Sequence, residues 1–432
     1  MTAEMWFLVL AILAPMASVV VIGLLVLLGE RRPGETTVAA IVGTGLVGSV
    51  VGGLLVTASF AGLFGPPLHG DVEFGDWLRI HEFVIPAVLR VDLVSVTIAL
   101  FSAVLTALVA RFSRRYLHKE PGFIRFFTLL GLFATGTQLV ALAGALELFF
   151  AGWELIGISS AFFIGFFHER EEPIRSSVRA FATYRLSDAG LLIATVATFE
   201  LLGSARFSAL PGAAALPPWE ATALALMFLL SAMGKSAQLP FSGWLPRAME
   251  GPTPSSALFY GAVSIHAGLF LLLRAWPVFE ASAVARGVGV AVGLATAVYA
   301  AAVVRVHTDA KGTLAHATLA QVGLILAEIC LGWTTLALVH MVCHAFLRLG
   351  QYLKAPNTIH DTHRVGHSAH RHGVLDRWFP GLAARLYVHS LHRLRLDDRI
   401  DVAFSPVMAL AHGLDRADRW LRRTLTLDGP AA

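Results

Sequence analysis

The sequence predicts an all-α polytopic membrane protein with about eleven transmembrane helices, one of them broken near Lys235. Of its 432 residues, 56% are hydrophobic and only 14% are charged, and the mean hydropathy is +0.69. Apolar runs of about 20 residues recur along most of the chain, which is the length that crosses a bilayer as a helix. This composition excludes a soluble enzyme.

The apolar windows define the predicted spans in order. They lie at residues 5–28, 37–62, 91–110, 124–144, 146–167, 179–202, 220–239, 255–275, 286–304, 313–331 and 334–353. The first is too long and too continuously apolar for a signal-peptide core, so we expect a true span. Cys330 and Cys343 both fall inside spans, which favours packing roles over a disulfide or a thiolate metal site.

Lys and Arg gather in alternate short loops, and this asymmetry predicts the orientation. The basic loops contain Arg31, Arg32, Arg111, Arg114, Arg115, Lys119, Arg125, Arg170, Arg175, Arg179, Arg247, Arg305 and Lys311. We therefore expect a multi-pass protein of the inner (plasma) membrane, with its N-terminus outside and its C-terminal tail in the cytoplasm. Short alternating stretches over residues 71–90 predict an external hairpin.

Three regions follow from these patterns. Residues 1–84 hold the first helices and the hairpin, residues 85–353 the transmembrane core, and residues 354–432 a basic, His-rich tail. Apolar positions at helical spacing in the tail predict amphipathic helices on the membrane surface or against a partner. The tail also contains His360, Asp361, His363, His367, His370 and His372. Their spacing fixes no coordination geometry, so no metal site is predicted.

Two charged residues are central to the functional interpretation. Glu154 lies mid-span, where an unpaired carboxylate costs several kcal/mol. Lys235 ends an apolar helix that prolines at positions 240 and 246 then interrupt, and it is the expected partner of Glu154. A broken helix that carries a charge inside a membrane is typical of an ion path. The pair is interpreted either as a proton-transfer pair or as a static ion pair that tethers two helices.

Other polar residues within spans form predicted faces. His340, His344 and Arg348 recur every four residues, which stacks them on one helix face as a proton relay or as hydrogen-bonded core residues. Arg185 and Asp188 also share a face, either as a structural salt bridge or as a gate for Glu154 and Lys235.

Further candidates are weaker. Glu328 lies close to the predicted outer end of its helix, where a snorkelling interfacial charge is the alternative to a function. His266, Lys311 and His316 have the same ambiguity. Asp92 and Glu147 lie near helix starts, where exposed N–H groups favour a carboxylate without any further function.

Several motifs together resemble the antiporter-like subunits of respiratory complex I. They are the segment Tyr116 to Phe127, Gly152-Trp153-Glu154, Lys235 with the broken segment after it, Gly251-Pro252-Thr253-Pro254, and His340 with His344. The resemblance covers residues 85–353 and is greatest to chain 5, or subunit L. The wider superfamily includes Mrp-type cation/proton antiporters and the membrane subunits of DabB-type inorganic carbon pumps.

The resemblance implies a mechanism for particular residues. Glu154 and Lys235 match the family's proton-transfer pair, and His340 and His344 match its hydrated central axis. Arg185 and Asp188 then become plausible modulators of the pair.

Two departures stand against this pattern. Tyr260 occupies a position where subunit L has a histidine, so the lateral relay is altered or runs through the phenol, water or His266. Arg348 replaces a lysine, and it is expected to be a fixed charge because arginine does not release its proton.

The second of the family's two inverted repeats is predicted to stop after three helices. Either a partner subunit completes the proton path, or Glu328 and His340 provide a shorter exit.

The sequence therefore predicts a proton-translocating membrane subunit of a larger complex, with a DabB-type carbon-pump subunit and a non-conducting scaffold as alternatives. We expect no cofactor and no reaction chemistry in this chain alone. The expected partners are the lipid bilayer, other membrane subunits that complete the proton path, and either a soluble redox arm or a DabA-like zinc subunit. No nucleic acid is expected.

Overall fold

A computed structural model provides the fold. It describes residues 2–29, 32–80, 83–307, 309–355, 380–395, 399, 402, 405, 409, 410, 413, 414 and 416–421. The chain forms two compact units, Met1–Ser368 and Ala369–Ala432. The predicted histidine-rich stretch of the tail, residues 360–372, lies outside the described residues.

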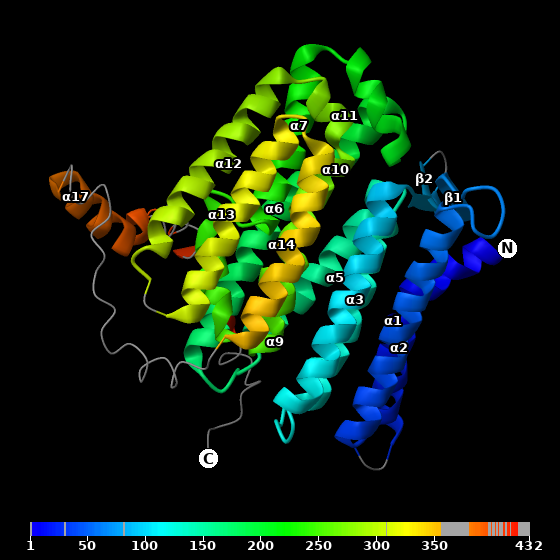
Figure 1. The fold of residues 1–432 in the computed structure, drawn as a ribbon, viewed down its shortest axis with the longest axis horizontal. Helices are drawn as coiled ribbons and strands as arrows, with labels where there is room; N and C mark the ends of the chain where they lie inside the picture. The colour runs from blue at the N-terminus through cyan, green and yellow to red at the C-terminus, as the bar shows by residue number, and fades with distance from the viewer. Residues whose placement is uncertain are drawn as a thin grey trace. The chain divides into compact units, whose positions relative to one another are not determined.

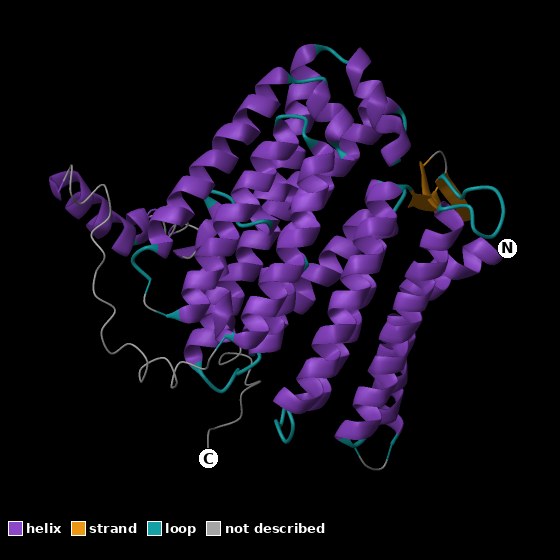
Figure 2. Ribbon diagram, viewed as in Figure 1, coloured by secondary structure: helices purple, strands orange, loops and turns teal. Residues whose placement is uncertain are grey.

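The first unit is a bundle of long helices (Figures 1 and 2). Its first half contains α1 (Ala3–Leu28), α2 (Glu35–Phe60), α3 (Leu93–Tyr116), α4 (Phe123–Leu142), α5 (Leu146–Ile164), α6 (Glu171–Leu202) and α7 (Pro218–Lys235). Its last three helices are α12 (Ala283–Val304), α13 (Ala310–Cys330) and α14 (Thr334–Lys354). Large apolar side chains on α1, α2 and α12 are exposed, as expected of helices that face lipid.

The chain is broken between α7 and α12. Lys235 ends α7, and short turns follow: η2 (Phe241–Gly243), α8 (Trp244–Arg247), η3 (Ala248–Glu250), α9 (Thr253–Ser255), η4 (Ser256–Ala262), η5 (Ser264–His266), α10 (Ala267–Arg274) and α11 (Trp276–Glu280). Of these, η4 is a π-helix, and irregular helices of this kind often occur at functional sites. The predicted break after Lys235 is thus confirmed.

Nine helical stretches among the described residues are long and apolar enough to cross a membrane, counting Thr253–Arg274 as one bent helix. α6 and α7, of 32 and 18 residues, lie at the other two predicted spans. Every predicted span therefore coincides with a helix, and the chain is a multi-pass membrane protein.

The predicted hairpin is also present, so the unit is not purely helical. β1 (Gly70–Ile80) and β2 (Phe83–Val91) pair antiparallel, from Gly70 opposite Val91 to Ile80 opposite Phe83, with two irregularities in register. Isolated bridges connect Leu89 to Ala143 and Ala145 to Arg206, so the hairpin lies against the turns at the same end of the bundle. The short helix η1 (Phe207–Ala215) also lies there.

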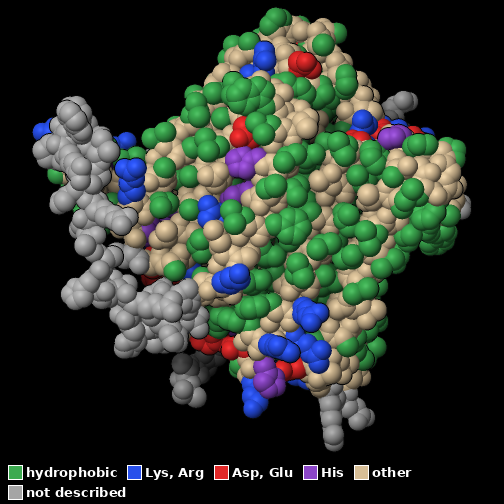
Figure 3. Space-filling model, in the orientation of Figure 1, with side chains coloured by type: hydrophobic (Ala, Val, Ile, Leu, Met, Phe, Trp, Pro, Cys, Tyr) green, Lys and Arg blue, Asp and Glu red, His purple; other side chains and the backbone are tan. Residues whose placement is uncertain are grey.

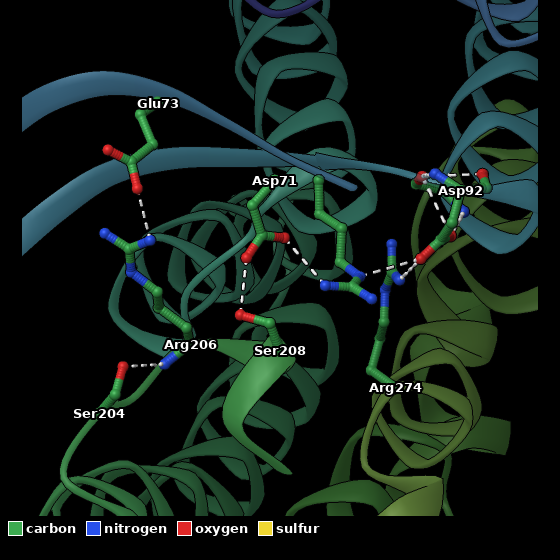
Figure 4. Close-up of polar contacts among 9 residues, drawn as sticks. Asp71, Glu73, Asp92, Ser204, Arg206, Ser208 and Arg274 are labelled. Carbon is green, nitrogen blue, oxygen red and sulfur yellow. Dashed lines mark hydrogen bonds and ion pairs between the residues drawn. The ribbon is translucent and has the colours of Figure 1, made fainter. Parts of the chain in front are cut away.

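Ion pairs join the two strands of this hairpin and connect it to the bundle (Figure 4). Arg90 bonds to Asp71 at 2.9 Å and to Asp92 at 3.1 Å, and Arg206 bonds to Glu73 at 2.6 Å. Asp92 caps α3 through Ser95 and is also paired with Arg274, the last residue of α10. One carboxylate therefore connects a helix start, the hairpin and the bent helix.

In the second unit the structure describes α17 (Pro380–Leu391) and η6 (Arg393–Arg395). The apolar side chains of Leu386, Tyr387, Val388 and Leu391 on α17 are exposed. The amphipathic character predicted for the tail stays a prediction.

Candidate functional site

Two groups of polar side chains lie within the helical bundle. The first, here called the lysine cluster, consists of Trp153, Glu154, Tyr184, Arg185, Asp188 and Lys235. The second, here called the histidine cluster, consists of His266, Gln321, Glu328, His340, His344 and Arg348. Both groups lie in spans, where polar side chains are costly unless they are partnered.

Lys235 is completely buried at the end of α7. Its Nζ donates to the backbone oxygen of Trp153 at 3.1 Å. The ammonium also lies 4.8 Å from the ring centroids of both Trp153 and Tyr184, within cation–π range. Ring faces and one carbonyl therefore replace part of the hydration that burial removes.

The two carboxylates of the lysine cluster share a different cation. Arg185 Nη2 lies 2.5 Å from Glu154 Oε2 and 2.7 Å from Asp188 Oδ2. The Trp153 indole N–H donates to the other oxygen of Asp188. With all four groups ionised, two carboxylates and two cations make the cluster neutral.

This arrangement corrects the predicted direct pairing of Glu154 with Lys235. Among the described residues, Arg185 makes the contact with Glu154, and Lys235 instead faces the Trp153 carbonyl. The physical reason is position: Arg185 projects from α6 with its Nη2 close to both carboxylates, whereas the Lys235 ammonium is directed to the Trp153 carbonyl. The prediction that Arg185 and Asp188 share a helix face is confirmed.

A chain of hydroxyl groups adjoins the lysine cluster. Ser160 Oγ lies 3.1 Å from the Tyr184 hydroxyl and 3.2 Å from the Tyr260 hydroxyl. Tyr260 in turn donates to the Ser160 backbone oxygen at 3.1 Å. All three residues are completely buried. Tyr260 stands where the resemblance predicts a histidine. Ser160 connects it to Tyr184, and the ring of Tyr184 contacts Lys235.

The histidine cluster contains an ordered series of hydrogen bonds. His266 Nδ1 lies 2.7 Å from the Ala262 carbonyl oxygen, and His266 Nε2 lies 3.0 Å from His344 Nδ1. Arg348 Nε donates to His344 Nε2 at 3.2 Å. A carbonyl oxygen only accepts a hydrogen bond, so His266 is protonated at Nδ1. His344 Nε2 accepts from Arg348, which leaves the proton of a neutral His344 on Nδ1, facing His266 Nε2. His344 must then donate from Nδ1, and both rings are neutral in this arrangement.

Glu328 and His340 complete this cluster. His340 Nδ1 lies 2.9 Å and 3.1 Å from the two oxygens of Glu328, and its Nε2 lies 3.0 Å from Gln321 Oε1. The rings of His340 and His344 are 6.4 Å apart, edge to face. The predicted stripe of His340, His344 and Arg348 is confirmed, and Glu328 is bonded to it.

Lys311 lies elsewhere, in the first turn of α13. It borders a cleft of about 360 Å³ together with Arg170, Glu250 and Asp309. A hydrogen bond with His307 and the Gly312 N–H lower the pKa of Asp309, which caps α13, to about 2. His316 lies one turn further on, with Nδ1 2.9 Å from the Gly312 oxygen. Neither Lys311 nor His316 belongs to the two clusters.

Sequence reasoning missed three members of the two clusters, Trp153, Tyr184 and Gln321, and also Ser160 in the adjoining chain of hydroxyl groups. Trp153 and Tyr184 are direct neighbours of Glu154 and Arg185 in the chain, and that adjacency was the available signal. Gln321 lies seven residues before Glu328, on the same face of α13. Ser160 had no signal beyond a small polar residue in an apolar span.

The bent segment η4–η5 lies between the two clusters. It carries Tyr260 toward α5 and α6, and six residues later His266 toward α14. Among the described residues no hydrogen bond joins the two clusters directly, so a proton that crosses between them needs water or a side-chain movement.

A multi-pass bundle with a broken helix, a buried lysine and a histidine stripe defines a class of polytopic membrane protein that holds partnered ionisable side chains in its interior. The chain belongs to the NADH:quinone oxidoreductase/Mrp antiporter family, whose transmembrane model matches residues 143–391. The model of the chain 5 N-terminus of NADH-ubiquinone oxidoreductase (complex I) matches residues 77–127.

Curated relatives agree with this family. The chain is 31% identical over 290 residues to NADH-quinone oxidoreductase subunit L of Mycobacterium tuberculosis, which covers 66% of this chain and 46% of that one. It is 31% identical over 391 residues to NADH-ubiquinone oxidoreductase chain 5 of Rhizopus stolonifer, covering 90% of this chain and 58% of that one. The chain thus spans about half the length of the curated relatives it matches.

Solved structures share the fold. A chain of the Mrp complex from Dietzia sp. DQ12-45-1b superposes with a TM-score of 0.69 at 24% identity, covering 81% of this chain and 37% of that one. A chain of the membrane-bound sulfane sulfur reductase, an archaeal respiratory membrane complex, gives a TM-score of 0.68 at 18% identity, covering 80% of this chain and 70% of that one.

Proposed function

We propose that this chain is a proton-translocating membrane subunit of a larger complex, similar to chain 5 of NADH-quinone oxidoreductase. The observation that carries the proposal is the lysine cluster, in which a completely buried Lys235 adjoins one arginine shared by two carboxylates. A scaffold gains nothing from such costly charges inside a membrane.

The charge balance of the cluster explains how it could move a proton. A proton that binds Glu154 removes one negative charge, so the cluster becomes positive and Arg185 is left with Asp188 alone. Two unit charges about 4 Å apart interact by about 4 kcal/mol at an effective dielectric of 20. The positive cluster therefore favours release of a proton from Lys235, and the ring faces beside its ammonium accommodate the neutral amine.

The histidine cluster receives this proton in the proposed path. His340 and His344 conduct it, and Arg348 is a fixed charge because its guanidinium keeps its proton. Because Lys235 faces the ring of Tyr184, water carries the proton from Lys235 to the Tyr184 hydroxyl, and Ser160 and Tyr260 pass it on. Redox chemistry belongs to partner subunits, in keeping with the names of the curated relatives. Cofactor-free operation of this chain remains a prediction.

The test uses the tagged full-length chain, purified in mild detergent with everything that stays bound and reconstituted in liposomes. Glu154→Gln is expected to lower potential-driven proton flux by about 100-fold, the scale of a lost acid–base group. Glu147→Gln, on the same helix but outside the cluster, is the matched control and should leave the flux nearly unchanged. Equal flux in Glu154→Gln and the native chain, at equal protein level, would refute the proposal.

Mass spectrometry of the same preparation identifies the coupled reaction. Quinone-reducing or hydrogenase-type subunits would make the chain part of a redox-driven pump. A DabA-like zinc subunit would instead support the inorganic carbon pump, and the absence of any partner would favour the scaffold.

A further inference from the structure

Titratable side chains lead from the middle of the bundle to the turn between α13 and α14. His266 and His344 are buried, with 2% and 4% of their surface exposed. The side chains of His340 and Glu328 are 24% and 17% exposed. Glu328 lies only two residues before Cys330, where α13 ends. His340 and Glu328 are therefore partly exposed near the α13–α14 turn, whereas His266 and His344 are buried. On the face drawn in Figure 3, histidine and acidic side chains reach the surface together among hydrophobic ones.

Each link except one in this series is a direct hydrogen bond. His266 bonds to His344 at 3.0 Å, and His340 bonds to Glu328 at 2.9 Å. Between His344 and His340 the ring centroids are 6.4 Å apart, so this step needs a ring movement or one bridging water.

A snorkelling carboxylate does not account for Glu328. Both of its oxygens face His340 Nδ1, and the other ring nitrogen of His340 faces Gln321, two helical turns further from the end of α13. The carboxylate thus points into a polar seam between the helices. A residue that only snorkels points its charge away from the bundle.

The bonding of His340 is suited to holding and releasing a proton. Both ring nitrogens face acceptors, the Glu328 carboxylate and the Gln321 oxygen, so the doubly protonated ring satisfies both. After the Nδ1 proton passes to Glu328, the neutral ring keeps its Nε2 hydrogen bond to Gln321. Rotation of the Gln321 amide would then offer an N–H to an unprotonated Nε2 and accommodate the other tautomer.

We propose that Gln321, His340 and Glu328 form the outlet through which a proton leaves the histidine cluster at the α13–α14 turn. His340 gives its Nδ1 proton to a Glu328 oxygen, Glu328 gives it to water, and His340 is reprotonated from His344. With the predicted orientation this surface is the outer one. The inference rests on the proposed function, and it assigns an exit within this chain.

Thiol accessibility tests the outlet in intact cells. In a full-length chain with Cys330→Ala and Cys343→Ala, a single cysteine is placed by Glu328→Cys or, as the control, by Leu324→Cys. Leu324 is on the same helix and more exposed, at 37%. Because the water-solvated thiolate is the reactive form, a charged membrane-impermeant reagent added outside should modify position 328 at least about tenfold faster than position 324.

Equal rates at the two positions, or modification of position 328 only from the cytoplasmic side of inverted vesicles, would overturn the outlet. If Glu328→Cys accumulates poorly, Gln321→Cys replaces it with the same expectation. Flux then separates the two proposals. If only the outlet is wrong, Glu328→Gln keeps the native flux while Glu154→Gln still lowers it by about 100-fold. If the proposed function is wrong, both variants keep the native flux. Glu328→Asp should restore most of the flux.

Discussion

Gly157 creates the space in which the two cations of the lysine cluster lie. A Cβ at this position would come within 2.9 Å of Lys235 Nζ and 3.7 Å of Arg185 Nη2. Gly157→Ala should therefore displace the ammonium, and we expect about tenfold lower proton flux with little loss of protein, since helix propensity favours alanine. Gly350→Ala, where no atom lies within 4 Å of the added Cβ, is the control. The measurement is the proton flux of both variants. Native flux in Gly157→Ala would show that the position of the Lys235 ammonium is not critical.

Tyr260 tests whether the hydroxyl chain takes part in transfer. Tyr260→Phe keeps the ring against Trp244 but removes the bond to Ser160. We expect flux to fall by about tenfold, the low end of what a lost proton-transfer group costs. Ser160→Ala should cause the same loss, because it removes the middle of the same chain. Tyr352→Phe, equally buried but outside the chain, should not. Independent effects of Tyr260→Phe and Ser160→Ala in the double variant would contradict a shared path.

At the scale of elements, the hairpin and the bent helix depend on one carboxylate. Burial by itself raises the pKa of Asp92, but the charge of Arg274 and hydrogen bonds from Ser95, Arg274 and Arg90 outweigh it and lower the pKa to about 2. A lowered folded-state pKa stabilises the fold above the unfolded value, and this contribution is lost only as pH falls from about 4 toward 2.

Asp92→Asn should therefore destabilise the bundle by about 2 kcal/mol near neutral pH, because it leaves the buried Arg274 without its counter-charge. The measurement is the apparent Tm in detergent, compared with Asp76→Asn, whose partner Arg79 is exposed. The difference between Asp92→Asn and the native chain should shrink as pH approaches 2. An equal Tm for the Asp92→Asn and Asp76→Asn variants would show that this junction is not a structural anchor.

The elements were largely predictable from sequence, while their partners were not. Spans are long apolar helices because the backbone polar groups must bond to each other inside a bilayer. Hydropathy therefore predicted the position of each span. Short stretches of alternating polar and apolar residues predicted the hairpin, and prolines predicted the break after Lys235. Pairing was harder, because both Lys235 and Arg185 are long enough to reach Glu154. Only the tertiary arrangement of α5, α6 and α7 decides that Arg185 makes the contact. The π-helical turn that carries Tyr260 likewise has no local sequence signal.

At the scale of the whole molecule, the chain divides at residue 368 into a membrane bundle and a tail unit. The bundle contains both polar clusters, and its ion pairs and hydrogen bonds described above all lie before that residue. The tail helix α17 instead exposes Leu386, Val388 and Leu391, an apolar set suited to a membrane surface or a partner subunit.

Removal of residues 369–432 should accordingly leave the bundle folded but weaken its assembly. We expect the shortened chain to accumulate in the membrane with an apparent Tm within about 4 °C of the native chain, which corresponds to at most about 3 kcal/mol for a bundle of this size. Partner subunits should be depleted when it is purified. The full chain with Leu386→Ser and Leu391→Ser should lose the same partners, because it keeps the length of the tail and removes only its apolar face. A large drop in Tm would instead mean that the tail supports the bundle, and retention of all partners by both variants would place the assembly surface on the membrane helices.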